Sequence, residues 1–265
     1  QNDPELSDIG LVIFDEFHER NLESDLALAL CLDLQGVLNA DLRLLVMSAT
    51  LDADNLAQFL ETAKTISCSG RQFPIETRYR GQHTPVQDRE LALREIIRAA
   101  HDENGSILVF VAGIADIKWL CSRLSDHQPA LSDDHWIIAP LHGGLSRREQ
   151  DMAIAPAPVG TRKIVIATDV AETSITIEGI RIVIDTGLQR RPLYKPGTGL
   201  TRLKTMPVSK ASADQRRGRA GRMESGICVR LWSHQADGWL VPSHRPEILS
   251  CDLCSLALEL AAWGT

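Results

Sequence analysis

The segment KIVIATDVAETSITIEGIRIVID, residues 163–185, decides the fold class of this chain. It begins and ends with continuous apolar runs, KIVIA and RIVID, which show no alternation of apolar and polar positions. Such runs are typical of strands buried on both faces, as in a parallel sheet that helices cover on each side. Ligands of these sheets bind beyond the carboxyl ends of the strands, so the polar residues after the first run are functional candidates.

The same kind of apolar run recurs along the chain, with helical patterns between the runs. The further runs are LVIF (11–14), RLLVM (43–47), ILVFV (107–111), WIIA (136–139) and ICVRLW (227–232). Amphipathic stretches occupy 26–38, 88–100 and 115–124. This alternation predicts an α/β doubly wound architecture with parallel sheets.

Two changes of pattern predict domain boundaries. Glycine and proline residues interrupt any long periodic element at 69–85, which indicates a linker. After Pro242 the chain continues with a proline-rich turn and a lone helical pattern at 249–263. We interpret this tail as the start of another domain.

Composition and charge limit the class of protein. The 265 residues are 44% apolar and 24% charged, which argues against disorder and leaves room for two domains. No apolar run approaches the roughly 18–20 residues that cross a bilayer, and the start lacks a signal pattern, so we expect a cytoplasmic protein. The net charge of −7 argues against a surface that coats nucleic acid throughout. Basic residues cluster between Arg181 and Arg222, where a nucleic-acid groove and a solvated face are both open interpretations.

The six cysteines are scattered through apparent core segments, where reduced cysteine behaves as a small hydrophobe. Cys251 and Cys254 form a CxxC, but no second cysteine or histidine pair follows, as a zinc site would require. The apolar helical pattern around this pair favours burial over zinc or redox chemistry.

Paired carboxylates follow the first apolar run. Asp15 and Glu16 stand directly after LVIF, and a charge pair at the end of a buried strand requires a cation or hydrogen-bond donors. Mg²⁺ held against nucleotide phosphates would supply that balance. An equally open interpretation is that the pair caps a helix.

Two further strand ends carry polar groups. Ser48-Ala49-Thr50 follows RLLVM and by itself is consistent with a helix cap. In QRRGRAGR, residues 215–222, a helix would place Gln215, Arg219 and Arg222 on one face. Two guanidiniums and an amide on one face suit a triphosphate. The alternative is an exposed basic helix, which its two glycines would destabilise.

The ordered motifs VIFDEFHER, VMSAT, ATDVAETSITIEGI and SKASADQRRGRAGR resemble those of the DEAH/RHA helicases of superfamily 2, with DEFH in place of DEAH as in the bacterial HrpB-type branch. The resemblance covers nearly the whole chain. It implies tandem RecA-like domains with parallel sheets, the first one incomplete, followed by the start of a winged-helix domain. The implied boundaries are 1–69, 70–240 and 241–265.

The resemblance also implies the nucleotide contacts, with ATP and Mg²⁺ as cofactors. Asp15 and Glu16 would hold Mg²⁺ through its waters, and Glu16 would help to activate the attacking water. His18 would couple this site to Ser48 and Thr50.

Other implied contacts lie later in the chain. Gln215 would position the attacking water, and Arg219 and Arg222 would act as arginine fingers. Glu178 stands where the family often has an Asp that meets the ribose.

The nucleic-acid partner implied is single-stranded RNA or DNA, contacted through its backbone. Thr168 and Thr173 fall where the family touches that backbone, Asp169 replaces a frequent Asn, and His142 and Gly143 are candidates for the same path. Backbone contacts suit a motor that moves past any sequence.

No G-x-x-x-x-G-K-[ST] phosphate-binding loop occurs in the sequence. We therefore expect a piece of an ATP-dependent helicase that is inactive alone and lacks its amino-terminal half and its further carboxyl-terminal domains. The alternative is a nucleic-acid-binding or regulatory module without ATPase activity. A β-hairpin is predicted at 189–205 from its central Pro-Gly-Thr-Gly, either for strand separation, as the resemblance implies, or as an ordinary surface hairpin.

Overall fold

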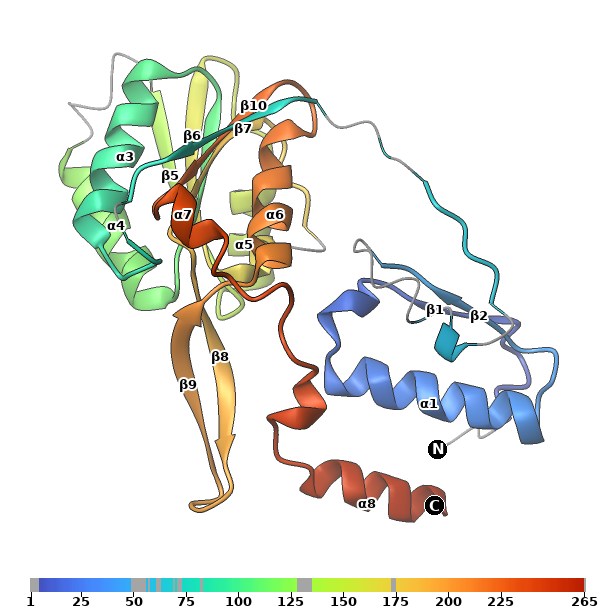
Figure 1. Ribbon diagram of the computed structural model, residues 1–265. Helices are drawn as coiled ribbons and strands as arrows, with labels where there is room; N and C mark the ends of the chain where they lie inside the picture. The colour runs from blue at the N-terminus through green and yellow to red at the C-terminus, as the bar shows by residue number, and fades with distance from the viewer. Residues whose placement is uncertain are drawn as a thin grey trace. The chain divides into compact units, whose positions relative to one another are not determined.

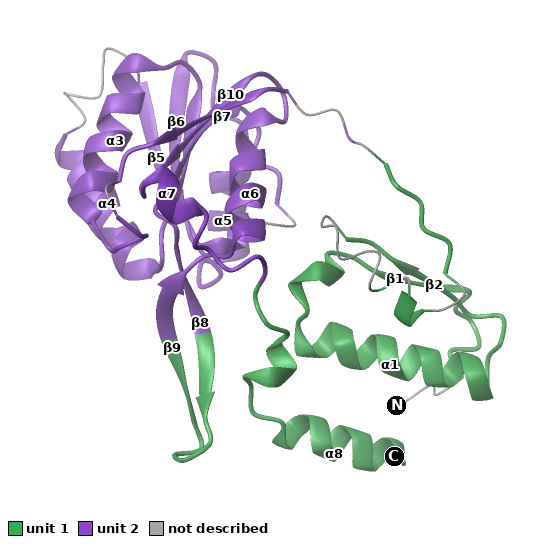
Figure 2. Ribbon diagram, viewed as in Figure 1, with its two compact units in different colours: residues 1–68, 192–203, 244–265 green, residues 69–191, 204–243 purple. Residues whose placement is uncertain are grey.

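The computed structural model of this chain describes residues 5–48, 56, 58–60, 63–68, 70, 73–81, 83–127, 135–172 and 175–264. Thr50 and Thr173, both with predicted functional contacts, lie outside these ranges. The chain forms two compact units (Figure 2). The smaller unit contains residues 1–68, 192–203 and 244–265, and the larger contains 69–191 and 204–243.

The larger unit is built on a six-stranded sheet whose strand pairings are all parallel. The strand order is β3-β10-β7-β4-β6-β5 (Figure 1). The strands are β3 (Ile75–Tyr79), β4 (Ser106–Phe110), β5 (His135–Leu141), β6 (Thr161–Ala167), β7 (Ile180–Asp185) and β10 (Gly226–Arg230). Five of them coincide with the apolar runs predicted in this region, so the parallel α/β fold class is confirmed.

Helices cover both faces of this sheet, with α3 and α4 on one side and α5 and α6 on the other (Figure 1). Their bounds are α3 (Arg89–Asp102), α4 (Ile114–Asp126), α5 (Arg147–Ile154) and α6 (Lys210–Gly218). Alternate residues of the central strands enter separate clusters. Ile107 and Val109 of β4 pack in the cluster that contains Ile96 of α3. Leu108 packs in the other, with Ala153 of α5. This burial on two sides explains why the central strands are apolar at successive positions.

The helices of the larger unit begin where the sequence supplies a capping side chain. Asp88 accepts a hydrogen bond from the Leu91 N–H at 2.8 Å at the start of α3. At the start of α5, Ser146 and Glu149 form a reciprocal capping box. Such contacts satisfy backbone donors that lack a partner within the helix.

The linker predicted at 69–85 is partly wrong, because β3 lies within it. This strand forms one edge of the sheet and pairs in parallel with β10. Edge strands tolerate charged side chains, since only one side of the strand is hydrogen-bonded within the sheet. The sequence IETRY therefore lacks the continuous apolar run that identifies the central strands.

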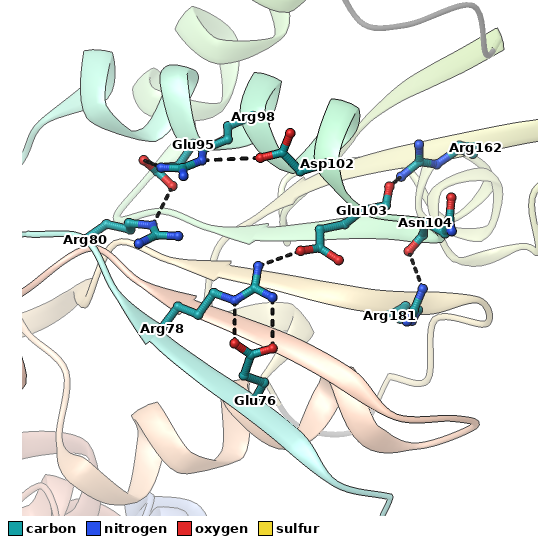
Figure 3. Close-up of polar contacts among 10 residues, drawn as sticks. All are labelled: Glu76, Arg78, Arg80, Glu95, Arg98, Asp102, Glu103, Asn104, Arg162 and Arg181. Carbon is teal, nitrogen blue, oxygen red and sulfur yellow. Dashed lines mark hydrogen bonds and ion pairs between the residues drawn. The ribbon is translucent and has the colours of Figure 1, made fainter.

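Ion pairs connect β3 to α3, as Figure 3 shows. Arg78 donates from Nε and Nη2 to the two carboxylate oxygens of Glu76, each at 2.8 Å, and from Nη1 to Glu103 at 2.5 Å. Arg80 donates from Nε to Glu95 of α3 at 3.2 Å. These contacts pair the charged residues of the edge strand with carboxylates of the strand itself and of α3 and its carboxyl end.

The smaller unit contains the two-stranded parallel sheet of β1 (Leu11–Phe14) and β2 (Arg43–Val46), with helix α1 (Leu22–Val37). Phe14 packs with Leu28 of α1 in a small core. Leu11, Ile13 and Leu45 are 47, 52 and 43% exposed. Within the described residues, these two runs are therefore strands as predicted, but the prediction that both of their faces are buried is wrong, because α1 covers one face only.

Strands β8 (Leu188–Lys195) and β9 (Leu200–Pro207) form a separate two-stranded sheet, which confirms the hairpin predicted at 189–205. Its turn is closed by the N–H groups of Thr198 and Gly199, which donate to the carbonyl oxygen of Lys195 at 2.9 and 3.0 Å. Gly199 has a φ of +64°, a conformation that glycine adopts without steric cost.

The carboxyl-terminal part contains α7 (His234–Asp237), a 3₁₀ turn (Glu247–Leu249) and α8 (Cys254–Trp263). The burial predicted for the CxxC is wrong, because Cys254 is exposed and Cys251 is half-buried. Within the described ranges, no group of three or more His, Cys, Asp or Glu side chains is arranged to hold a metal ion. Among the same residues, no helix has the length and hydropathy needed to span a membrane.

Candidate nucleotide and nucleic-acid site

The predicted acidic pair lies directly after β1, at the carboxyl end of the strand. Glu16 has a left-handed backbone, with φ 50° and ψ 35°, and its N–H donates to Oδ1 of Asp15 at 2.8 Å. Non-glycine residues in this conformation are uncommon and occur often at functional sites. A 3₁₀ turn, Phe17–Glu19, follows, but among the described residues Glu16 makes no side-chain hydrogen bond that caps it. The capping interpretation of Glu16 therefore lacks its defining contact.

The predicted coupling residues lie beside this acidic turn. His18 is largely buried, and its Nε2 lies 3.5 Å from Oε2 of Glu16. The N–H of Phe17 donates to the carbonyl oxygen of Met47 at 3.0 Å, so the turn is bonded to the end of β2. Ser48 is the next residue and is exposed. The backbone thus brings the two predicted segments together, and the coupling of His18 to Ser48 stays a prediction.

The candidates for nucleic-acid binding lie after two neighbouring strands. The N–H of Thr168, which follows β6, donates to the carbonyl oxygen of Leu141 at the end of β5, at 3.2 Å. His142 comes next in the chain and is half-buried, as is Thr168. Gly143 and Asp169 are exposed. These four candidates therefore line one end of the sheet, where ligands of parallel α/β folds bind.

The continuous helix expected at 215–222 is wrong, because α6 ends at Gly218 and a 3₁₀ turn, Arg219–Gly221, follows. The turn lies close against the chain at the start of β3. A Cβ added to Gly221 would lie 2.6 Å from Cγ1 of Ile75, which is closer than side chains approach. Glycine at this position therefore has a packing reason that the spacing of the motif did not reveal.

Both predicted arginine fingers bond the segment that follows β6. Arg219 is 8% exposed, and its Nε donates to the carbonyl oxygen of Glu172 at 3.0 Å. Its Nη groups donate to the carbonyl oxygens of Glu172 and Ile175. Arg222 is exposed and donates from Nη1 to Oγ1 of Thr176 at 2.6 Å. The arginines thus connect the turn after α6 to the segment that contains the nucleic-acid candidates.

The remaining nucleotide candidates of the larger unit are Gln215, half-buried in α6, and Glu178, exposed in the loop before β7. They belong to the same unit as Arg219 and Arg222. The acidic turn with Asp15 belongs to the smaller unit. The predicted nucleotide contacts are therefore divided between the two units.

Arg216 is the functional candidate that the sequence analysis missed. Its side chain is fully buried, and it forms ion pairs of 2.9 Å with both Glu172 and Asp185. Burial by itself lowers the pKa of a guanidinium, but the two carboxylates outweigh it, so the pKa of Arg216 is raised. Burial raises the pKa of Asp185, against the opposing attraction of Arg216. The signal in the sequence was Asp185, a charge at the end of an apolar strand that requires a buried partner.

This fold, with acidic and hydroxyl residues after its strands and an arginine-rich segment at the end of α6, is that of the RecA-like domains of superfamily 2 helicases. The helicase conserved C-terminal domain family matches residues 88–224. The chain belongs to this family and, within it, to the DEAH/RHA helicases.

Similar proteins are consistent with this assignment. The chain is 47% identical to the ATP-dependent RNA helicase HrpB of Escherichia coli K12, over 100% of the chain and 32% of the relative. It is 35% identical to the human probable ATP-dependent RNA helicase DHX34, over 98% of the chain and 23% of the relative. A crystal structure of the E. coli DEAH/RHA helicase HrpB matches with a TM-score of 0.90 and 45% identity, over 100% of the chain and 33% of the solved one. The chain thus spans about a third of the length of HrpB.

Proposed function

We propose that this chain acts in an ATP-dependent RNA helicase, where it couples ATP hydrolysis to movement along a nucleic-acid strand. The observation that carries the proposal is that Arg219 and Arg222 bond Glu172, Ile175 and Thr176, a few residues after the candidates for nucleic-acid binding. A helicase requires such a connection between the groups that contact phosphate and those that contact the strand. The names of the relatives favour RNA over DNA as the substrate.

The acidic turn fits a role in holding Mg²⁺. Asp15 and Glu16 supply carboxylate oxygens, the ligands that Mg²⁺ prefers, and the left-handed backbone of Glu16 marks a constrained turn at the strand end. Bound Mg²⁺ would offset charge on the phosphates of ATP. Glu16 would accept a proton from the attacking water, with His18 beside it at 3.5 Å.

The larger unit would supply the groups that stabilise the transition state. Gln215 would orient the attacking water, and Arg219 and Arg222 would donate to the oxygens of the γ-phosphate. Glu178 would contact the ribose. Each arginine would exchange its present oxygen acceptors for phosphate oxygens, which accept charge-assisted hydrogen bonds more strongly.

The strand ends of β5 and β6 would contact the nucleic-acid backbone through Thr168, Asp169, His142 and Gly143, together with Thr173. We further infer that residues 1–69 act as the carboxyl-terminal part of a first RecA-like domain, 70–240 as a second, and 241–265 as the start of a winged-helix domain. Because the sequence contains no phosphate-binding loop, the 265 residues alone should not hydrolyse ATP.

The test begins with the encoding DNA. A reading frame that continues upstream of Gln1 into a G-x-x-x-x-G-K-[ST] segment would support the proposal. The protein expressed from the complete reading frame should then hydrolyse ATP faster when RNA is added, and it should separate an RNA duplex that carries a single-stranded overhang. Glu16→Gln should abolish hydrolysis, whereas Arg94→Ala, on the exposed surface of α3, should leave it unchanged.

A different result would support the alternative of a binding module. If the protein from the complete reading frame binds RNA but neither hydrolyses ATP nor separates strands, the helicase proposal is overturned.

A further inference from the structure

Arg216 lies between the two segments of the larger unit that contain the nucleotide candidates and the nucleic-acid candidates. Its Nε donates to Oε2 of Glu172 and its Nη1 to Oδ1 of Asp185, each at 2.9 Å. Nη1 also donates to the carbonyl oxygen of Leu188 at 3.2 Å, and the guanidinium lies 4.9 Å from the ring centroid of Phe110. A single side chain thus contacts the segment after β6, the end of β7, the start of β8 and the end of β4.

Stability alone is a poor explanation for this arrangement. Taking a guanidinium and two carboxylates out of water carries a desolvation cost that their attraction only partly offsets, and apolar residues of similar size are often at least as stable. A buried ion pair does, however, fix the orientation of its side chains, because the planar guanidinium donates hydrogen bonds only along its N–H bonds. The geometry therefore favours a positioning role over a purely stabilising one.

The position of Arg216 in the chain shows what it would hold in place. Gln215 precedes it directly, and Arg219 follows on the next turn. On the other side of the ion pair, Glu172 comes three residues after Asp169. One buried contact therefore connects the segment with nucleotide candidates to the segment with nucleic-acid candidates.

We propose that Arg216 is a positioning residue that couples the two segments through Glu172, so that nucleic-acid binding and nucleotide binding change each other's affinity. This inference rests on the proposed helicase function. Arg219 donates to the backbone carbonyl oxygen of the same residue, whereas Arg216 donates to its carboxylate. The charge of the Glu172 side chain is thus the element that a substitution can remove selectively.

Glu172→Gln is the test, because Arg216→Ala would leave the fully buried Asp185 without its cation and could unfold the domain. The glutamine keeps an oxygen that accepts from Nε, and the pair between Arg216 and Asp185 stays intact. Arg216→Lys is the companion variant, since an ammonium cannot reproduce the planar fork that bonds both carboxylates. Glu90→Gln, on the exposed surface of α3, is the matched control.

The measurement is the Kd of fluorescent single-stranded RNA, with and without a non-hydrolysable ATP analogue, for the protein from the complete reading frame. For wild type and Glu90→Gln, the Kd values with and without the analogue should differ, so that their ratio departs clearly from one. Glu172→Gln and Arg216→Lys should reduce that ratio by about 2- to 30-fold. The Kd without the analogue should stay within about twofold, because neither residue contacts the strand in the proposal.

The outcomes separate the inference from the function on which it rests. A wild-type protein that hydrolyses ATP and separates strands but whose two Kd values are equal would overturn the inference and leave the helicase function standing. A wild-type protein with a clear ratio that Glu172→Gln and Arg216→Lys preserve would overturn the positioning role alone. A Glu172→Gln protein that loses its cooperative thermal unfolding would show the contact to be structural and would also overturn it.

Discussion

The Nε atom of Arg219 donates a hydrogen bond to the backbone carbonyl oxygen of Glu172 over 3.0 Å. The side chain is nearly buried, and its other donors bond carbonyl oxygens of the same segment. Arg222 differs, because it is exposed and donates from Nη1 to a side-chain hydroxyl, that of Thr176. The two arginines therefore have the same proposed role but different structural surroundings, which allows catalysis and stability to be separated.

Arg222→Ala should lower kcat for ATP hydrolysis by a large factor, because arginine fingers contribute about 10³- to 10⁵-fold in well-studied NTPases. Its effect on the free energy of unfolding should stay within about 0.5 kcal/mol, as for most surface substitutions. Arg219→Ala should lower kcat similarly and also destabilise the protein by about 1–3 kcal/mol, because buried carbonyl groups lose their donors. Steady-state kinetics and denaturant unfolding of the protein from the complete reading frame provide both readings.

Lysine should rescue activity poorly at either position, since a point charge cannot replace the planar fork. Arg94→Ala serves as the surface control. A normal kcat together with weakened, strongly salt-dependent RNA binding would instead assign both arginines to the nucleic-acid surface.

The hairpin gives a second prediction. Deleting residues 195–200 removes the turn between β8 and β9, whose flanking side chains Leu193 and Leu203 are exposed. If the hairpin separates strands, the deletion should reduce RNA unwinding far more than ATP hydrolysis, because the residues proposed to contact the nucleotide lie outside the hairpin. Unwinding and ATPase assays on the same preparation measure the two losses. Equal losses of both activities would indicate simple misfolding.

Limited proteolysis tests the relative stability of the two units. In the part of the chain that the structure describes, the sheet of the smaller unit has two strands, and apolar side chains such as Ile13 are exposed on it. The central strands of the larger unit are buried on both faces. Regions with few buried contacts open more readily. In the 265-residue chain, cleavage should therefore begin within residues 1–69, as mass spectrometry of the fragments would report. Survival of this region while residues 100–230 are digested would refute the prediction that residues 1–69 are the less stable part.

The capping box of α5 predicts a dependence on pH. The pKa of Glu149 is lowered by its hydrogen bonds to the side chain and backbone of Ser146. A carboxyl group with a depressed folded-state pKa stabilises the protein above its unfolded pKa, and this contribution is lost as the pH falls through the folded value. Glu149→Ala should therefore be less stable than wild type at pH 7, with the difference shrinking towards pH 3.

Ser146→Ala removes the other half of the box and should lower the free energy of unfolding by about 1 kcal/mol at pH 7. Its effect provides the reference for a lost cap. Urea unfolding of the 265-residue chain at several pH values is the measurement. A stability difference for Glu149→Ala that does not change between pH 7 and pH 3 would rule out the ionised carboxylate as the source.

The sequence by itself determined the parallel α/β class, the central strands and the order of the motifs. These features are local, because continuous apolar runs such as ILVFV and KIVIA mark the strands directly in the sequence. Only the tertiary structure decided the place of β3, because an edge strand with one neighbour needs no apolar run. It also decided that β1 and β2 are exposed on one face and that α6 ends at Gly218. Arg216 could not be identified from its spacing, since its partners Glu172 and Asp185 lie 44 and 31 residues away and only the folding of α6 against β7 brings the three charges together.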